Sequence, residues 1–218
     1  MLKHWPIVLL ALAGCREERS VLLTDRLEAT VKSGISGIIS IEPSVTVRWR
    51  GETIAEGREV YYLSFGQNTA VRDDAHRRVI MIDHDGNRTD LPCPDGASLA
   101  PDRFPGIDCW AGHNAYDFSI TRYAGNGRVV SKLTAPTFVQ KCGQVSIGMV
   151  GYDPRGEAVI GYECMVDGAR MCRATTLGDS PVDMGEIPAT TASVDCSYLI
   201  RTQGKPLSGV RSWSTVRN

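Results

Sequence analysis

Short runs of β-branched and aromatic residues recur along the chain from about residue 38, and each run is bounded by Gly, Pro, Asp or Asn. Runs of this length and composition between such boundaries are typical of β-strands. The predicted strands cover residues 38–41, 45–50, 60–65, 78–83, 88–91, 116–123, 128–133, 145–152, 158–164, 170–176 and 197–201. The turn dipeptides between them are Asp85-Gly86, Asn126-Gly127, Arg155-Gly156 and Asp167-Gly168. Strands joined by such short turns pair as antiparallel hairpins, so the pattern predicts an all-β, hairpin-rich domain.

The segment that precedes these strands has a different spacing. Leu23, Leu27 and Val31 lie four residues apart, which is the spacing of one helical face. Gly34 follows them, and glycine often ends a helix. The pattern therefore predicts a short N-terminal helix that ends near Gly34.

The spacing of the turn glycines bears on the architecture. Gly51, Gly86 and Gly127 follow one another at intervals of 35 and 41 residues. A propeller blade repeats at about 40–45 residues. The stretch RVIMIDHDGNRTDL, residues 78–91, resembles a hairpin of TolB-type propeller repeats. These observations favour a small or irregular propeller-like fold, and a disulfide-stapled β-sandwich is the alternative.

The N-terminus has the features of an export signal. Lys3 precedes an apolar run over residues 7–13, which is shorter than the about 20 apolar residues that cross a bilayer. The run ends in Leu12-Ala13-Gly14-Cys15, which resembles the lipobox of bacterial lipoproteins. The resemblance implies cleavage before Cys15 and attachment of diacylglycerol to its sulfur. An ordinary signal peptide or a buried N-terminal helix, with a chance cysteine, is the alternative.

The lipobox also predicts the domain organisation and the location. It implies a signal peptide over residues 1–14, a short lipidated tether over residues 15–19 and a single β domain over residues 20–218. The residue after Cys15 is Arg16 rather than Asp, which in enteric-type bacteria implies transfer to the outer membrane. The domain would then face the periplasm.

The cysteine count agrees with export. The chain has seven cysteines, and acylation of Cys15 leaves six. An even number in an exported domain favours disulfides over metal ligation, and no CxxC motif is present. The predicted disulfides are Cys93–Cys109, Cys164–Cys172 and Cys142–Cys196.

Two of these pairs rest on local sequence. Cys164 and Cys172 flank the Asp167-Gly168 turn, and a three-residue loop centred on Gly168 would place them opposite each other. Cys93 and Cys109 bracket a segment rich in proline and glycine, which a disulfide would close. The third pair follows by elimination, and free buried thiols or another pairing stay open.

The charge balance gives little indication of a charged partner. The chain carries a net charge of −1, and removal of Lys3 with the signal peptide makes this −2. Lysines and arginines form no basic stripe, so a nucleic-acid partner is not expected.

The stretch DHDGNRTD, residues 83–90, is a weak candidate for a metal site. Asp83, Asp85 and Asn87 lie at alternating positions around a glycine, and their order resembles the opening of a calcium loop. The acid that should end such a loop is missing, since Leu91 follows Asp90. A hairpin turn is the favoured interpretation, and no cofactor is expected.

No catalytic residues are predicted. The GISG stretch at residues 34–37 is not a GxSxG nucleophile elbow. His76, His84 and His113 lie in no HExxH-like arrangement. A pair of acids for glycoside cleavage stays open as an alternative, because carboxylates are plentiful.

Aromatic residues gather in and after the segment that Cys93 and Cys109 bracket. Arg103, Phe104, Trp110 and His113 are the candidate partner-binding residues, because arginine and aromatic side chains dominate binding hot spots. Phe118, which has strand spacing from Tyr116, is expected in the core. A disulfide would hold the binding segment in one conformation and lower the entropy cost of binding.

Together these features favour a non-catalytic protein-binding module anchored to the membrane by lipid. The overall build is similar to that of immunity lipoproteins of type VI secretion systems, which bind an antibacterial effector of a rival cell. That similarity implies a toxin as the periplasmic partner. An envelope-assembly or structural lipoprotein and a secreted hydrolase are the alternatives.

Overall fold

The computed structural model describes residues 15–24, 27–36, 39–100, 106–142, 147–178, 183–188 and 214–217. The chain divides into two compact units, Met1–Tyr61 with Thr215–Asn218, and Tyr62–Ser214. The prediction of a nearly all-β chain with antiparallel sheets is confirmed, and the β domain expected over residues 20–218 has this finer division. The strands are β1 (Cys15–Leu22), β2 (Leu27–Ser36), β3 (Ile39–Trp49), β4 (Glu52–Gly57), β5 (Val60–Phe65), β6 (Asn68–Asp73), β7 (Arg78–Ile82), β8 (Arg88–Pro92), β9 (Gly96–Leu99), β10 (Gly106–Ala111), β11 (Ser119–Ala124), β12 (Val129–Thr134), β13 (Ile147–Tyr152), β14 (Ala158–Val166), β15 (Ala169–Leu177), β16 (Asp183–Pro188) and β17 (Ser214–Val216).

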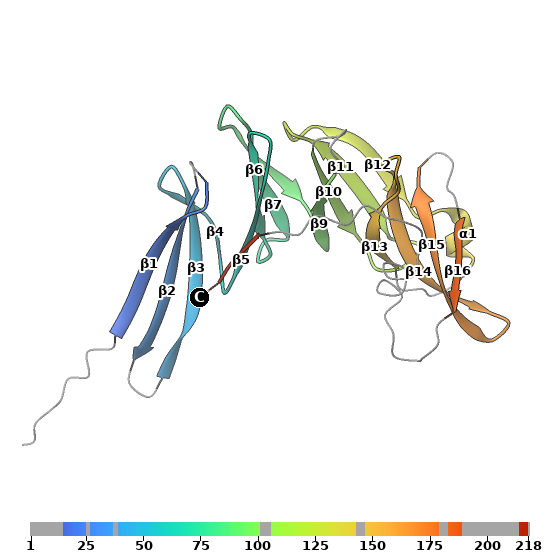
Figure 1. Ribbon diagram of the computed structural model, residues 1–218, viewed down its shortest axis with the longest axis horizontal. Coiled ribbons are helices and arrows are strands. Elements are labelled where there is room, and N and C mark those ends of the chain that lie inside the picture. The colour runs from blue at the N-terminus through green and yellow to red at the C-terminus, as the bar shows by residue number, and fades with distance from the viewer. Residues whose placement is uncertain are drawn as a thin grey trace, which may run out of the picture. The chain divides into compact units, whose positions relative to one another are not determined.

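The strands of the described residues form four sheets, and apart from β17 each sheet is built from strands that follow one another along the chain (Figure 1). The sheets contain β1–β4, β5–β8, β9–β12 and β13–β16, and β17 adds to the β5 edge of the second sheet. Four-stranded meanders of this kind are the blades of propellers, whereas a sandwich distributes its strands over two facing sheets. The topology therefore favours the propeller-like prediction over the sandwich.

The three glycines whose spacing suggested a blade repeat occupy equivalent turns. Gly51, Gly86 and Gly127 lie between the third and fourth strands of the first three sheets. Each has a positive φ, 84°, 82° and 79° respectively. Residues with a Cβ adopt this conformation at a cost, so the turn geometry explains why glycine recurs at this place.

The predicted N-terminal helix is wrong, because its segment forms β1 and β2. Leu27, Ala29 and Val31 are all buried, at 0, 0 and 3% exposure, and they alternate with other residues as on a strand. A spacing of four residues fits both a helix turn and two strand repeats, and Ala29 between the two larger residues makes the period two. The segment predicted as a tether, residues 15–19, is the first part of β1, where Cys15 pairs with Ile35.

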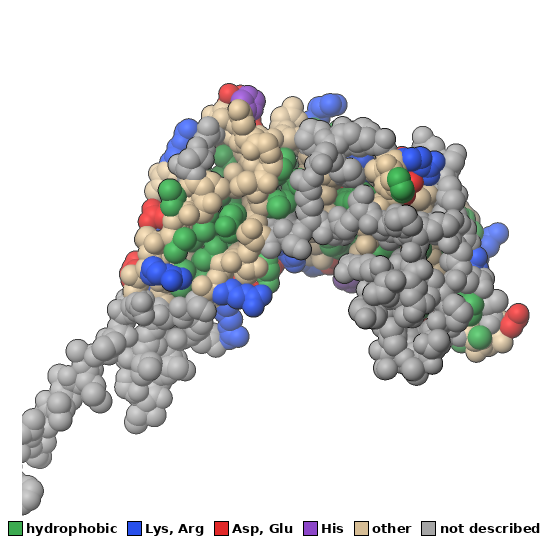
Figure 2. All heavy atoms as spheres, viewed as in Figure 1, with side chains coloured by type: hydrophobic (Ala, Val, Ile, Leu, Met, Phe, Trp, Pro, Cys, Tyr) green, Lys and Arg blue, Asp and Glu red, His purple; other side chains and the backbone are tan. Residues whose placement is uncertain are grey.

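Among the described residues of the second unit, two hydrophobic clusters lie in the core. One cluster joins the β5–β8 sheet to β9 and β10, and it contains Phe65, Met81, Leu91 and Ile107. The other joins β11 to β13, β14 and β15. Neighbouring sheets within this unit therefore pack on each other. On the face drawn in Figure 2, acidic and basic side chains of the described residues are spread over the surface.

The helix found among the described residues is α1 (Thr137–Gln140), which has four residues and buries Val139. In that part of the chain no helix has the length and apolar character needed to cross a membrane. The predicted signal peptide, residues 1–14, lies outside the described residues.

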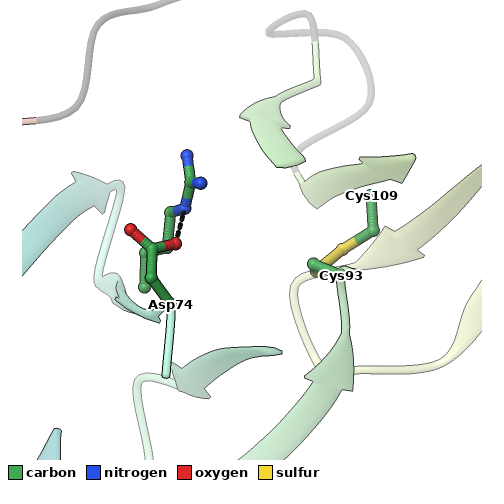
Figure 3. The surroundings of a disulfide bond; sticks show 4 residues. Asp74, Cys93 and Cys109 are labelled. Carbon is green, nitrogen blue, oxygen red and sulfur yellow. Dashed lines mark hydrogen bonds and ion pairs between the residues drawn. A yellow bond between two sulfur atoms is a disulfide. The ribbon is translucent and has the colours of Figure 1, made fainter. Parts of the chain in front are cut away.

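One disulfide has the predicted partners. Cys93 is bonded to Cys109, with 4.8 Å between their Cα atoms, and both residues are buried. Cys93 directly follows β8 and Cys109 lies on β10, so the bond links two neighbouring sheets through their shared core (Figure 3). The bracketed segment is less irregular than expected, because it contains the buried strand β9.

The predicted Cys164–Cys172 pair is wrong, because Cys164 is bonded to Cys142. The β14–β15 hairpin has a two-residue turn, Asp167-Gly168, rather than a three-residue loop. Cys164 is consequently opposite Met171, while Cys172 is opposite Glu163. Neighbouring strand positions point to opposite faces of the sheet, so the two sulfurs cannot meet.

The predicted Cys142–Cys196 pair is excluded by the same bond. The Cα atoms of Cys142 and Cys164 lie 5.0 Å apart, and the bond connects the end of α1 to β14. Cys172 is also disulfide-bonded, and Cys196 lies outside the described residues.

Candidate partner-binding site

The turn between β10 and β11, residues 112–118, is held together by one carboxylate. Asp117 Oδ1 accepts hydrogen bonds from the backbone N–H groups of His113 and Asn114, at 3.1 and 3.0 Å. Its Oδ2 accepts from Asn114 Nδ2 at 2.7 Å. Asn114 Oδ1 in turn accepts from the Tyr116 N–H at 2.9 Å. These local bonds fix the backbone of the turn, as Asp and Asn side chains often do.

A second carboxylate fixes the start of the turn. Asp95 Oδ2 accepts from the Gly112 N–H at 2.7 Å, and Oδ1 accepts from Arg77 Nη2 at 2.7 Å. His113 Nε2 lies 3.3 Å from the same Oδ1. Gly112 has a φ of +85°, and a Cβ there would lie 2.5 Å from Asp117 atoms. Glycine is therefore required where the chain leaves β10.

Buried contacts anchor the same turn to the second unit's core. Ala115 and Phe118 are 1 and 2% exposed and belong to the cluster with β13 to β15, as expected for Phe118. The His113 carbonyl accepts a hydrogen bond from the Ile147 N–H at 3.0 Å. The Tyr116 hydroxyl donates to the Gln140 carbonyl at 3.1 Å. Core packing and these two hydrogen bonds therefore hold the turn in place.

The outer side of the turn presents aromatic and basic groups to solvent. The exposed fractions are 76% for the His113 side chain, 70% for Tyr116 and 64% for the Arg77 side chain. Phe138, on the helix that accepts the Tyr116 hydrogen bond, is 37% exposed. We call Arg77, His113, Tyr116 and Phe138 the aromatic–basic surface.

The structure differs in part from the predicted binding residues. His113 is exposed on the turn as described, whereas Arg103 and Phe104 lie outside the described residues. Trp110 is partly buried on β10, where it packs against the core. It lies opposite Gly96, and a Cβ on Gly96 would come within 2.2 Å of the indole ring. Trp110 is therefore mainly a packing residue.

The pKa of Asp95 lies below its ordinary value of 3.8. Burial of its side chain raises this pKa, but the hydrogen bonds from Gly112 and Arg77 and the charges of His113 and Arg77 outweigh burial. Asp95 is consequently ionised at neutral pH and holds the two basic side chains against the turn.

The weak metal candidate is a hairpin turn. Asp83 Oδ1 accepts from the Asn87 N–H at 2.8 Å, and Oδ2 accepts from Asn87 Nδ2 at 3.0 Å. Asp83, His84 and Asp85 each bring one potential ligand atom within 4.8 Å of the others, but they are largely exposed. The hydrogen bonds from Asn87 also lower the pKa of Asp83.

The β13–β14 hairpin repeats this arrangement. The Glu157 N–H donates to Asp153 Oδ1 at 2.8 Å, and the Gly156 N–H donates to the Asp153 carbonyl at 2.8 Å. The corresponding bond in the first turn, from Gly86 N–H to the Asp83 carbonyl, is 3.0 Å long. The first position of both turns is therefore an aspartate that fixes the hairpin.

Sequence reasoning missed a buried polar network in the second unit. Arg122 donates two hydrogen bonds of 2.7 Å to Asp108, one to each oxygen. The Tyr152 hydroxyl donates to Asp108 Oδ2 at 2.9 Å and lies 2.8 Å from Ser98 Oγ. Burial, and then the charge of Asp108, raise the pKa of Tyr152. Because all four residues are less than 10% exposed, the network links β9, β10 and β11 to β13 rather than forming an accessible site.

Sequence also gave no signal for Arg77, Asp95 or Asp117 as parts of one site. Arg77 and Asp95 are 18 residues apart and meet only through folding.

No protein family, curated protein or solved structure matches this chain.

Proposed function

We propose that this chain is an envelope lipoprotein whose second unit binds another protein through the aromatic–basic surface. The observation that carries the proposal is the turn over residues 112–118, which is fixed by two carboxylates and yet presents His113 and Tyr116 to solvent. The Tyr116 hydroxyl bond to Gln140 uses only the end of the side chain, and the residue is still 70% exposed and accessible to a partner.

The chemistry of the surface supports protein recognition. Tyrosine and arginine are enriched among residues that dominate binding energy, and Tyr116 and Arg77 stand on a rigid support. A surface that is already ordered loses little conformational entropy when it binds. Arg77 and His113 favour a partner that offers acidic groups around an apolar centre.

The lipobox supports attachment of this binding unit to the membrane. Leu12-Ala13-Gly14-Cys15 would direct acylation at Cys15, and the disulfides fit an oxidising compartment such as the periplasm. The proposed location is the periplasmic face of the outer membrane. In its most specific form, the proposal is that the partner is an antibacterial effector that this chain inhibits.

Photo-crosslinking tests the binding surface. A benzophenone amino acid in place of Tyr116 should form an adduct with one periplasmic protein, identified by mass spectrometry. The same probe in place of Met165, which is 59% exposed on the β14–β15 hairpin, is the control and should give no such adduct.

Affinity measurements with the crosslinked partner then test the residues. Arg77→Glu should weaken binding by about 2 kcal/mol or more, as expected for a hot-spot arginine. Equal affinities of wild type and Arg77→Glu, with both chains folded, would refute the proposed surface. If the partner is a toxin, cells that lack this chain should lose viability when they are exposed to that toxin. If the partner is instead an envelope-assembly protein, the alternative function as an envelope-assembly lipoprotein is favoured.

A further inference from the structure

β12 (Val129–Thr134) is an edge strand with exposed apolar side chains. It pairs with β11 on one side, and in the described part of the chain no strand pairs with it on the other. Val129 and Val130 are 52 and 49% exposed. Val130 is the extra residue of a bulge, since Val129 and Ser131 pair with consecutive residues of β11. The strand therefore presents apolar side chains together with the outward-facing backbone groups of a sheet edge.

The fourth strands of the other three sheets are better protected against the addition of another strand. Charged side chains and prolines on an edge prevent such pairing. Each of these strands has at least two charged residues, and two of them also contain proline: Glu52 and Glu56 in β4, Arg88, Asp90 and Pro92 in β8, and Asp183, Glu186 and Pro188 in β16. β12 has no proline and no acid, and its one charged residue is Lys132. It is therefore the least protected of the four.

The charge at this edge favours an acidic partner. Arg128, directly before the strand, and Lys132 within it are both exposed. Among the described side chains, no carboxylate forms an ion pair with either of them. Opposite charges on paired strands attract, whereas a second copy of this chain would bring the same positive charges to the edge. The occupant that fits is an extended segment with acidic and apolar side chains.

We propose that the outer edge of β12 binds, by strand addition, an extended segment of another protein in which acidic and β-branched residues alternate. Main-chain hydrogen bonds to the edge supply affinity, and carboxylates near Arg128 and Lys132 supply specificity. These residues do not belong to the aromatic–basic surface, and their role does not depend on acylation of Cys15. The edge is thus a second binding site, and its failure would leave the proposed function in place.

Fluorescence anisotropy with a designed peptide tests the site. The probe is a labelled peptide as long as β12 in which valine and glutamate alternate, and it should bind the full chain purified in detergent. Arg128→Glu/Lys132→Glu should weaken this binding by about tenfold or more, because it replaces attraction with repulsion. A peptide of alternating valine and lysine should show the opposite preference. Arg50→Glu/Arg155→Glu, which changes the net charge equally at exposed turns of other sheets, is the matched control and should keep the wild-type affinity.

Backbone methylation separates strand addition from attraction between charges alone. The valine–glutamate peptide with methylated backbone nitrogens keeps its charge but cannot donate main-chain hydrogen bonds, so it should bind about tenfold more weakly or not at all. Equal affinities of the methylated and unmethylated peptides would overturn strand addition, and so would a failure of the unmethylated peptide to bind. Equal weakening by the control variant would also overturn the site. The peptide comparison uses the unaltered chain, so it stays decisive if a variant does not fold.

Discussion

Asp95 connects two groups that are far apart in the sequence, the backbone N–H of Gly112 and the side chain of Arg77. It accepts hydrogen bonds from Gly112 and Arg77 while its side chain is only 11% exposed. Hydrogen bonds to a charged group contribute about 1.5–3 kcal/mol each to stability, more than bonds between neutral groups. This residue therefore sets both the shape of the turn and the position of Arg77 on the aromatic–basic surface.

We expect Asp95→Asn to lower the free energy of unfolding by about 2 kcal/mol at pH 7, because a neutral amide cannot accept these bonds as strongly. The lowered pKa of Asp95 gives the effect a pH dependence. A carboxyl with a lowered folded-state pKa stabilises the fold above its unfolded pKa of about 3.9 and loses that stabilisation as the pH falls through the folded pKa.

Urea unfolding at several pH values measures this difference. Wild type and Asp95→Asn should differ by a constant amount above about pH 5, and the difference should shrink below about pH 4. Asp85→Asn, at a side chain that is 65% exposed, is the control and should change stability by less than about 0.5 kcal/mol. A difference for Asp95→Asn that persists unchanged at pH 2 would contradict the assignment.

The buried pair of Asp108 and Arg122 should respond differently to single and double substitution. Asp108→Leu leaves a buried guanidinium without its main partner and should cost about 3–5 kcal/mol. Arg122→Met in the same chain removes that charge, so the double variant should be more stable than Asp108→Leu alone. Tyr152→Phe removes one hydroxyl and should cost about 1 kcal/mol.

Thermal and urea unfolding of the four chains complete the comparison. If Asp108→Leu/Arg122→Met proved less stable than Asp108→Leu, Arg122 would have to be stabilised chiefly by groups other than Asp108.

At the scale of elements, the strands that alternate clearly were predictable. The predicted run 60–65 coincides with β5, and the runs 158–164 and 170–176 lie within β14 and β15. β9 was missed because all four of its residues are buried, so they show no alternation of apolar and polar positions. The predicted pairing of β14 with β15 differs from the observed register by one residue. This difference explains why Cys172 was wrongly predicted as the disulfide partner of Cys164.

The candidate site was predictable only where it lies within one stretch of sequence. The aromatic stretch after Cys109 pointed to His113, and strand spacing correctly placed Phe118 in the core. The same spacing could not separate Phe118 from exposed Tyr116, because residues 112–118 form a turn rather than a strand. Arg77 belongs to the site because it contacts Asp95, which lies on a separate part of the chain. The spacing of apolar residues along the sequence cannot predict such a contact.

The turn of the β11–β12 hairpin makes a further prediction at this scale. Gly127 has a φ of +79°, and a Cβ there would lie 2.5 Å from Thr89 Cγ2 on β8 of the preceding sheet. Gly66 has a φ of +59° with no atom within 4 Å of such a Cβ. Gly66→Ala should therefore cost about 1 kcal/mol from backbone strain alone, and Gly127→Ala about 1 kcal/mol more from the clash.

Thr89→Ala removes the clashing methyl group and provides the check. In urea unfolding, adding Thr89→Ala to Gly127→Ala should reduce the loss to about that of Gly66→Ala. No recovery in the double variant would mean that the hairpin does not approach β8 this closely.

At the scale of the whole molecule, the six cysteines other than Cys15 all belong to the unit Tyr62–Ser214. The Cys93–Cys109 and Cys142–Cys164 bonds close chain segments with sequence separations of 16 and 22 residues. Restriction of the unfolded chain by such a bond contributes about 3 kcal/mol each. Stability derived from disulfides is thus concentrated in one of the two units.

Reduction should consequently loosen the two units to different extents. Hydrogen exchange measured by mass spectrometry, with and without dithiothreitol, should show faster exchange in β9–β15 after reduction and little change in β2–β4, which belong to the unit without these bonds. The double variant Cys93→Ala/Cys109→Ala should reproduce part of the effect without reductant, with the largest change in β8 to β10, and this variant excludes a direct action of the reductant. If reduction accelerated exchange equally in both units, the two units would unfold together in one cooperative step. The disulfides would then stabilise the entire chain, and the two units would not differ in stability.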